Sequence, residues 1–502
     1  MSRNRRPARH ASDIPQNPFG QVPRAYAPTQ VLSADQINTL HEAALRVLAT
    51  TGIRVLSAPA RALFKTAGAR ADADMIVRFD PAMIAACLAT VPASFTLRAR
   101  NPAHDLHFGG ANMVFASVGG PAYVMDIDRG RRDGTHAEMC DYLRLIQSLN
   151  VIQQEGGGPF EALDLPANTR HLDLYLAQIT LLDKSWQTQT LGTARTMDGL
   201  EMAAIAMGCG VEALPPMLLG IINTNSPLQL DIPMAEGLIA LASHGQVNTI
   251  TPFTLAGAMS PVTLAGALVL QHAEAMAGIA LTQIVRPGVP VLYGGFTSNV
   301  DMRSGAPAFG TPEYAKAAQA SGQLARHIGV PFRSSNVTSA NAVDAQAAYE
   351  SQMALWGAVM GGAHLIEHAA GWMHGGLTAS FEKLILDAEM LQMLQAYLTP
   401  IATDPASLAL EAIAEVGPGG HFFGTSHTME RYEHAFHAPM LSNWDNHPQW
   451  LQKGAIEAPR RANVIWKQLL AEYQQPPLDP SIAEALADYV ARRAAEGGAP
   501  MN

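Results

Sequence analysis

Cysteine and charge are both scarce in this chain of 502 residues. It has three cysteines, Cys87, Cys140 and Cys209, and no two of them are spaced as a CxxC pair. That spacing indicates neither a disulfide framework nor a thiolate zinc site, and it suits a reducing compartment. Charged residues make up only 15% of the chain and the net charge is −10, which argues against a nucleic-acid partner.

An uninterrupted apolar span is also missing. The most apolar long stretch, residues 263–285, contains Gln271, His272 and Glu274, so we predict a buried helix there and no membrane segment. The basic start of the chain, residues 3–9, is not followed by the apolar run of a signal peptide. We therefore expect a cytoplasmic protein.

What the chain does contain is a regular alternation of short β-rich runs and helical stretches. The eight β-rich runs are 113–116, 151–154, 186–191, 217–223, 248–253, 290–293, 331–334 and 364–368. The eight helical stretches are 136–149, 168–183, 198–208, 231–243, 263–285, 311–328, 344–360 and 380–398. Such alternation requires parallel strands with crossover helices, and eight units are the number that closes a barrel.

The predicted fold class is therefore α/β, with a (β/α)8 TIM barrel at residues 111–400. A basic, proline-rich arm at 1–32 and a helical and mixed N-terminal subdomain at 33–110 precede it, and Ser33 and Gln36 are spaced as a capping box. A C-terminal segment at 401–502 carries a glycine-rich lid loop and terminal helices. An open doubly wound sheet is the alternative, although no GxGxxG follows the first strand.

The predicted strand ends are rich in glycine and in uncharged polar residues. In a barrel these ends line one pocket, and glycines there let a bulky planar cofactor approach the backbone. Gly156, Gly294 and Gly295 are candidates for that contact. The alternative for any one of them is a tight turn between strand and helix.

Charged side chains at the strand ends are few: Glu155, Glu367 and His368. Glu155 is a candidate to face a cationic substrate, and the alternatives are a catalytic base or a structural ion pair with a nearby His or Arg. His364, Glu367 and His368 resemble metal ligands, but their spacing is not HExxH, and on a strand His364 and Glu367 point to opposite faces. We predict no metal site.

A glycine-rich loop follows the last predicted barrel helix. Residues 417–424 read GPGGHFFG, which is incompatible with regular helix or strand. Glycines, histidines and aromatics in one loop favour a lid or a pocket wall over an ordered surface loop. Its candidate site residues are Gly419, Gly420, His421 and Phe422.

At these residues the sequence resembles the trimethylamine methyltransferase family of corrinoid-dependent methyltransferases, which includes members acting on quaternary amines such as glycine betaine. The resemblance covers nearly the whole chain. Its carriers are INTLHEAAL at 37–45, TGI at 51–53, DAQAAYE at 344–350 and, most specifically, GPGGHFFG at 417–424 with His427 and Thr428.

The resemblance implies a barrel whose mouth receives the corrinoid of a separate carrier protein, with no cofactor bound permanently. Gly156, Gly294, Gly295, Gly419 and Gly420 would face that corrinoid. Family members acting on trimethylamine carry pyrrolysine in the barrel, and no such residue occurs here. A quaternary amine is therefore the expected substrate, since it releases a neutral amine without proton transfer.

Aromatic faces and neutral dipoles suit a quaternary ammonium whose charge is lost during methyl transfer. The aromatic candidates are Phe253, Tyr293, Phe296, Trp372 and Phe422. If the substrate carries a carboxylate, the candidates to bind it are His364, His368 and His421, with Asn223 assisting.

Two other functions stay open on the sequence alone. One is a metal-dependent hydrolase or lyase that uses His364, Glu367 and His368. The other is a non-catalytic homologue that binds an amine. The expected partners are the carrier protein, a small quaternary amine and further copies of the chain, and we expect neither nucleic acid nor a membrane.

Overall fold

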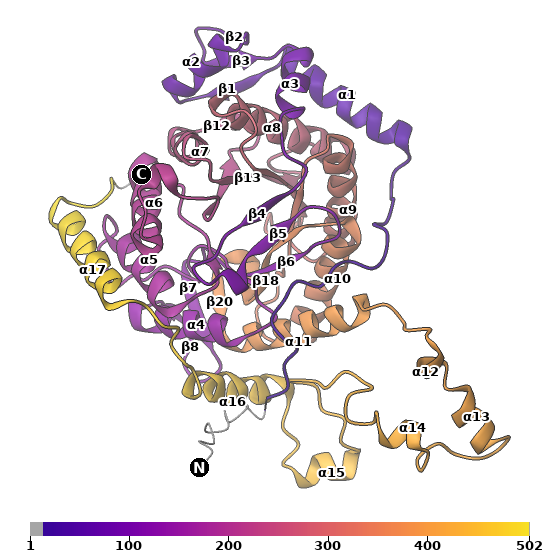
Figure 1. Cartoon of the computed structure of the whole chain (residues 1–502). Coiled ribbons are helices and arrows are strands. Elements are labelled where there is room, and N and C mark those ends of the chain that lie inside the picture. Colours follow the sequence, from indigo (N-terminus) through magenta and orange to yellow (C-terminus); the bar gives the residue numbers. More distant parts are fainter. Residues whose placement is uncertain (1–13, 501–502) are drawn as a thin grey trace.

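A computed structural model describes residues 14–500, so the basic start of the chain lies outside the described residues. The fold is α/β, with eight strands of a parallel sheet at its centre and a helix after each of them (Figure 1). The strands are β6 (Val114–Ser117), β9 (Gln154–Glu155), β10 (Ser185–Trp186), β11 (Leu219–Thr224), β13 (Val247–Ala256), β14 (Val291–Gly294), β17 (Phe332–Ser335) and β18 (Leu365–Ala370). The helices are α4 (His136–Ser148), α5 (Arg170–Leu181), α6 (Thr193–Met207), α7 (Ile232–Ser243), α8 (Leu264–Val285), α9 (Pro312–His327), α10 (Ala345–Gly361) and α11 (Phe381–Leu398).

The strand pairings lead around a ring. Parallel ladders join β11 to β13, β14, β17, β18, β6, β9 and β10 in that order. β10 meets β11 through a single parallel bridge between Gln187 and Leu219, next to which the amide of Thr188 donates to the carbonyl of Leu219 at 3.0 Å. The pairings thus return to the strand at which they begin, and we call these eight strands the ring.

Two predicted strands are shorter than expected. The run at 151–154 is a strand only from Gln154, and the run at 186–191 is a strand only at its first residue. A side chain takes the place of the ladder next to β9, because the Gln153 amide oxygen accepts from the backbone of Phe115 at 2.7 Å. Helix α6 begins at Thr193, five residues before its predicted start.

Helix α8 is the apolar stretch that the sequence places inside the protein. It spans 22 residues and is long and apolar enough to cross a membrane, yet 78% of its most apolar window is buried within the chain. Its polar residues have partners there: Gln271 donates to Tyr293 and Ser321, and Glu274 accepts from Thr224 and Ser226. The prediction of a buried helix is confirmed.

Apolar side chains fill the amino-terminal half of the ring. A hairpin of β4 (Phe95–Leu97) and β5 (Leu106–Phe108) lies across this end (Figure 1). The cluster beneath it consists of Leu97, Leu106, Phe108, Val114, Ala116, Leu219, Val247, Leu292 and Leu365. Because this half is packed solid, the ring can hold a ligand only at its carboxyl end.

The rest of the N-terminal region is fastened to the ring. Its elements are α1 (Ala34–Thr50), β1 (Ile53–Val55), α2 (Ala58–Thr66), β2 (Arg70–Ala71), β3 (Ile76–Arg78) and α3 (Pro81–Leu88). The predicted capping box of Ser33 and Gln36 begins α1. Strand β12 (Gln229–Leu230), from the loop after β11, pairs with β1 in the four-stranded order β12-β1-β3-β2.

Loops at the carboxyl ends of the ring strands form small sheets of their own. The order β19-β20-β7-β8 joins the loops that follow β6 and β18, and β15 continues beside β13. These strands are β7 (Tyr123–Asp126), β8 (Gly130–Asp133), β15 (Phe296–Val300), β16 (Pro307–Ala308), β19 (Trp372–Met373) and β20 (Thr378–Ser380). They build walls above the ring.

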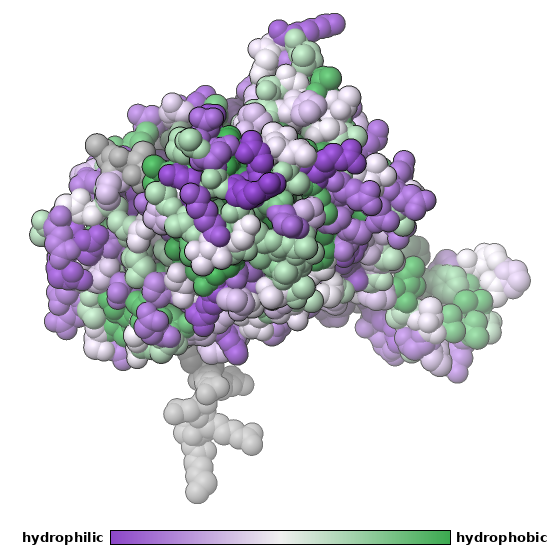
Figure 2. All heavy atoms as spheres, turned by 90° about the horizontal axis from the view of Figure 1, so that it is seen from above, coloured by the Kyte–Doolittle hydropathy of each residue, from purple (hydrophilic) through white to green (hydrophobic). Residues whose placement is uncertain are grey.

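The C-terminal segment leaves the ring and then returns to it. Short helices α12 (Pro405–Leu408), α13 (Leu410–Val416), α14 (Ser426–Met429) and α15 (His447–Gln452) project to one side (Figure 1). This projecting segment carries apolar side chains on its surface, visible as green spheres at the right of Figure 2. We refer to residues 401–452 as the arm.

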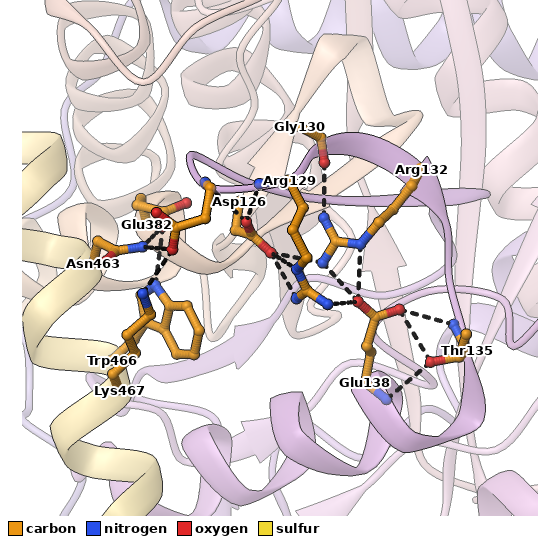
Figure 3. A network of polar contacts seen from close by, with 11 residues as sticks. Asp126, Arg129, Gly130, Arg132, Thr135, Glu138, Glu382, Asn463, Trp466 and Lys467 are labelled. Atoms are coloured by element: carbon orange, nitrogen blue, oxygen red, sulfur yellow. Dashed lines mark hydrogen bonds and ion pairs between the residues drawn. The ribbon is translucent and has the colours of Figure 1, made fainter.

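Helices α16 (Ala458–Ala471) and α17 (Pro480–Ala495) dock back onto the ring helices. Figure 3 shows Asn463 and Trp466 of α16 donating to the buried carboxylate of Glu382 in α11, each at 2.9 Å. In α17, Tyr489 and Arg493 hold Asp198 of α6. Polar contacts therefore fix both helices to the outside of the ring.

Candidate active site

A cavity of about 410 Å³ opens at the carboxyl end of the ring. Residues from all eight strands, or from the loops that follow them, surround it. The lining is Gly119, Gly120, Gly156, Gly157, Glu161, Gln187, Thr188, Gln189, Thr190, Leu191, Ile221, Asn223, Met234, Thr251, Phe253, Phe296, Arg333, His368, Trp372 and Gly376. Most of these side chains are neutral, as the sequence predicts for the strand ends.

One wall of the cavity is aromatic. The ring centroids of Phe253 and Phe296 are 5.1 Å apart, and Phe296 lies 6.3 Å from Trp372. Phe309 packs behind this wall, 5.8 Å from Phe296 and 6.2 Å from Trp372. Three aromatic residues that the sequence singles out thus come together, and their faces suit a cation.

His368 reaches the cavity because its backbone is unusual. Its φ is 53°, in the left-handed region that side chains other than glycine rarely adopt, at an irregular register between β18 and β6. The imidazole lies 4.3 Å from Trp372, and its Nδ1 accepts from the amide of Gly119 at 3.4 Å. Burial, aided by Arg333, lowers the pKa of His368 well below its usual range, so the ring is neutral.

Arg333 is the cationic residue inside the cavity. It lies in β17 with 1% of its surface exposed, and its guanidinium carbon is 5.5 Å from the ring centroid of Phe296. Within residues 14–500, Nε and Nη1 of Arg333 have no hydrogen-bond partner. Arg333 is not among the site residues predicted from the sequence, although a single arginine within the strand run PFRSS was a signal for it.

Glu367 lies inside the ring beside this cavity. Its Oε2 accepts from the side-chain amide of Gln187 at 2.8 Å, whereas Oε1 has no partner among the described residues. Burial raises the pKa of Glu367 to about 7, against the opposing effect of Arg333. The carboxyl is thus partly protonated near neutral pH.

Glu155 does not line the cavity but shapes its rim. Its oxygens accept from the amides of Gly157 at 2.9 Å and Gly158 at 2.7 Å, and from the side chain of Gln178. Burial raises the pKa of Glu155 to about 7. The role expected for it, facing a cationic substrate, does not fit this position, because the carboxyl points into the layer between strands and helices.

The rim glycines Gly119 and Gly156 are packed backbone against backbone. A Cβ at Gly119 would lie 1.7 Å from the carbonyl oxygen of Gly156, and a Cβ at Gly156 would lie 2.3 Å from that of Ser117. Glycine is therefore required at both positions for the two loops to meet.

Four predicted site residues lie away from the cavity. Tyr293 points outward to Gln271 of α8, since it alternates with Leu292, which faces inward. Gly294 and Gly295 pack tightly against neighbouring side chains: a Cβ at Gly294 would lie 2.2 Å from Thr251, and a Cβ at Gly295 would lie 2.8 Å from Ser321. His364 precedes β18 at the amino end of the ring, where Nδ1 accepts from the amide of Phe332 and burial lowers its pKa to about 4.

The glycine-rich loop does not cover the cavity either. Gly419, Gly420, His421 and Phe422 belong to the arm, and no residue described at 401–452 lines the cavity. The four are exposed, because the arm's helices are too short to bury an apolar face against the ring. The expected lid is therefore wrong for this arrangement of the chain.

The metal-site alternative loses its ligand set. His364 precedes β18 and bonds to Gly110, His368 is four residues further along in the strand, and Oε2 of Glu367 accepts a hydrogen bond from Gln187. Within the part of the chain that the structure describes, no three His, Cys, Asp or Glu side chains are grouped to hold a metal ion.

These features define an α/β enzyme whose cavity lies at the carboxyl ends of parallel strands. Residues 1–498 match the family described as "Trimethylamine methyltransferase (MTTB)". The chain belongs to this family of methyltransferases.

Its similarity to individual members extends over nearly the full length. A glycine betaine methyltransferase of Desulfitobacterium hafniense is 36% identical over 471 residues, which cover 93% of this chain and 98% of that protein. The trimethylamine methyltransferase MttB2 of Methanosarcina mazei is 26% identical over 492 residues, covering 93% and 96%. The monomethylamine methyltransferase structure of Methanosarcina barkeri matches with a TM-score of 0.47 at 9% identity over 93% of both chains.

Proposed function

We propose that this protein transfers a methyl group from a quaternary amine resembling glycine betaine to the Co(I) corrinoid of a separate carrier protein. The observation that carries the proposal is the wall of Phe253, Phe296 and Trp372 in a cavity with mostly neutral lining. The 36% identity to a glycine betaine methyltransferase supports the choice of substrate.

The chemistry favours such a wall over a carboxylate. In the transfer the methyl carbon forms a bond to cobalt with the electron pair of Co(I), and the C–N pair stays on nitrogen as a neutral amine. A full carboxylate against the ammonium would stabilise the substrate more than the transition state. Aromatic faces attract the cation by only about 0.5–2 kcal/mol, so they oppose the loss of charge less. Asn223 is a further proposed substrate contact in this lining.

The corrinoid is proposed to approach over the glycine rim. Gly119, Gly120, Gly156 and Gly157 lie along one side of the cavity and offer backbone without side chains. Of the glycines expected to face the corrinoid, Gly156 is therefore the one we retain. Its neighbour Glu155 holds the amides of the following glycines and keeps the rim in shape.

Two further expectations, on the closure of the barrel and on the cellular compartment, belong with this proposal. We infer that the ring is the predicted (β/α)8 barrel, on the strength of the pairings that lead back to β11. We also retain the proposal of a cytoplasmic protein, because a Co(I) acceptor requires a reducing compartment and the three cysteines are free.

The test is a reconstitution of the purified protein with a Co(I) corrinoid carrier, followed through the absorbance of the methyl-Co(III) product. Glycine betaine, carnitine and trimethylamine are offered in turn. We expect product with a quaternary amine and none with trimethylamine. Absence of methyl-Co(III) with every quaternary amine would contradict the proposed reaction.

A further inference from the structure

We propose that Arg333 binds the carboxylate of a zwitterionic substrate and so makes the cavity selective for betaines over plain quaternary amines. This inference rests on the proposed function and assigns the anion-binding role within the same site. Of the three histidines expected for that role, His364 lies at the other end of the ring and His421 lies in the arm. His368 does line the cavity, but burial and Arg333 lower its pKa well below the usual range, so its imidazole is neutral and offers no charge to a carboxylate.

The first support is the state of the guanidinium. Arg333 is buried, lines the cavity, and leaves Nε and Nη1 unpartnered within the described residues. Unpaired charge in a protein interior is costly, so a buried arginine normally has a carboxylate or phosphate partner. An anion that enters the cavity would supply the missing partner, and a carboxylate can do so through two parallel hydrogen bonds.

The second support is that Glu367, the carboxylate beside the cavity, does not pair with the guanidinium of Arg333. Glu367 is the obvious counter-ion, yet none of the ion pairs in residues 14–500 joins it to Arg333 within 4.0 Å. Gln187 occupies Oε2 of Glu367, and burial keeps the pKa of this carboxyl at about 7. Glu367 therefore offers only part of a negative charge near neutral pH.

The third support is the position of the aromatic wall. The guanidinium carbon lies 5.5 Å from the ring centroid of Phe296, so the anion-binding group and the cation-binding faces are neighbours. A zwitterion can satisfy both at once. A quaternary amine without a carboxylate would instead bring a second positive charge beside Arg333 in a buried site, where repulsion is weakly screened.

The test measures a ratio of affinities by calorimetry, without the carrier protein. The ligands are glycine betaine and choline, which share the trimethylammonium group and differ in the carboxylate. The variants are Arg333→Gln, Arg333→Lys, which keeps the charge but not the paired donors, and Arg326→Gln, which changes an exposed arginine that does not line the cavity.

We expect Arg333→Gln to reduce the preference for glycine betaine roughly 10- to 150-fold, which corresponds to a hydrogen-bonded charge pair. The preference of Arg333→Lys for glycine betaine should lie between those of Arg333→Gln and wild type, and Arg326→Gln should keep the full preference. Thermal unfolding of each variant shows whether it is folded. A purely structural arginine would change both affinities together, because it does not distinguish the two ligands.

A preference that survives in folded Arg333→Gln overturns the inference, as does a wild-type protein that binds neither ligand. The methyl-transfer assay separates this outcome from the proposed function. If glycine betaine binds with an Arg333-dependent preference but yields no methyl-Co(III), Arg333 is the carboxylate-binding residue and the proposed reaction is contradicted. If methyl-Co(III) forms equally well in wild type and Arg333→Gln, the proposed reaction is supported and the carboxylate-binding role of Arg333 is contradicted.

Discussion

At the scale of single residues, the aromatic wall depends on ring faces and not only on apolar volume. Phe253 is partly exposed to the cavity and lies 5.1 Å from Phe296. We predict that Phe253→Leu weakens glycine betaine binding by about 2- to 30-fold, because a cation–π contact contributes about 0.5–2 kcal/mol and leucine has no π face. Titration calorimetry measures the change.

The matched control for that change is Phe95→Leu, since Phe95 stacks on Phe108 in the hairpin at the other end of the ring. It should leave the affinity unchanged. Equal affinities in wild type and Phe253→Leu would mean that the wall serves only as packing.

Glu367 gives a prediction for pH. Burial raises its pKa to about 7 in the folded protein, whereas an unfolded glutamate titrates near 4.3. Between these values the folded state binds more protons, so this residue lowers the stability as the pH rises from about 4 to 7. Glu367→Gln removes the effect, and the free energy of unfolding of the variant relative to wild type should increase by on the order of 3 kcal/mol between pH 4.5 and 8.

Urea unfolding at a series of pH values measures that difference. Glu212, whose side chain is 90% exposed, supplies the control, because Glu212→Gln should follow the wild-type curve throughout. Parallel curves for Glu367→Gln and wild type would show that Glu367 titrates normally in the folded state.

At the scale of elements, the loops after β6 and β9 meet only because both carry glycine. We predict that Gly119→Ala destabilises the protein by about 1–3 kcal/mol, since its Cβ would overlap the carbonyl oxygen of Gly156 at 1.7 Å and the loops must separate. Methyl transfer should fall as well if the carrier docks on this rim.

Gly210→Ala is the control for that substitution, because no atom lies within 4 Å of its added Cβ and its φ of −82° suits alanine. Chemical denaturation and the methyl-Co(III) assay are the measurements. A Gly119→Ala protein with wild-type stability would show that the two loops adjust without cost.

The elements themselves follow closely from the sequence. Periodicity places all eight ring helices, and α6 alone begins well before its predicted start. Strands β9 and β10 are the exceptions among the strands, because side chains such as that of Gln153 bond to neighbouring backbone where a ladder was expected. Local pattern cannot reveal such a replacement, since the partner at Phe115 is distant in sequence.

At the scale of the whole molecule, the arm presents apolar side chains without covering them. Phe423 is 83% exposed and Phe436 is 85% exposed. An apolar surface of this kind is typical of a protein interface. We predict a homo-oligomer, with a mass in solution above the 53.4 kDa of one chain, and expect Phe423→Ser with Phe436→Ser to shift it toward the monomer.

Light scattering after size-exclusion chromatography measures the mass. Val262→Ser is the control, because Val262 is 68% exposed but lies outside the arm. A wild-type protein that elutes as a monomer would contradict the prediction and leave the arm for a different partner.

The sequence by itself determined the α/β class, the order of strands and helices and the carboxyl ends of the strands as the place of the cavity. These depend on periodicity and on the parallel pairing that crossover helices impose. Of the residues that the sequence singles out, Gly156, Asn223, Phe253, Phe296, His368 and Trp372 line the cavity.

Only the tertiary structure decided which inward positions reach the ligand space. Tyr293 faces outward because side chains alternate along a strand. His364 lies at the amino end of the ring, whereas the cavity is at the carboxyl end. Arg333 faces the cavity although it precedes the end of β17. The register between neighbouring strands sets how far along the axis of the ring each side chain lies, and Arg333 is paired with Gly294. A residue's height and facing depend on its neighbours across the sheet, and those neighbours are distant in the sequence.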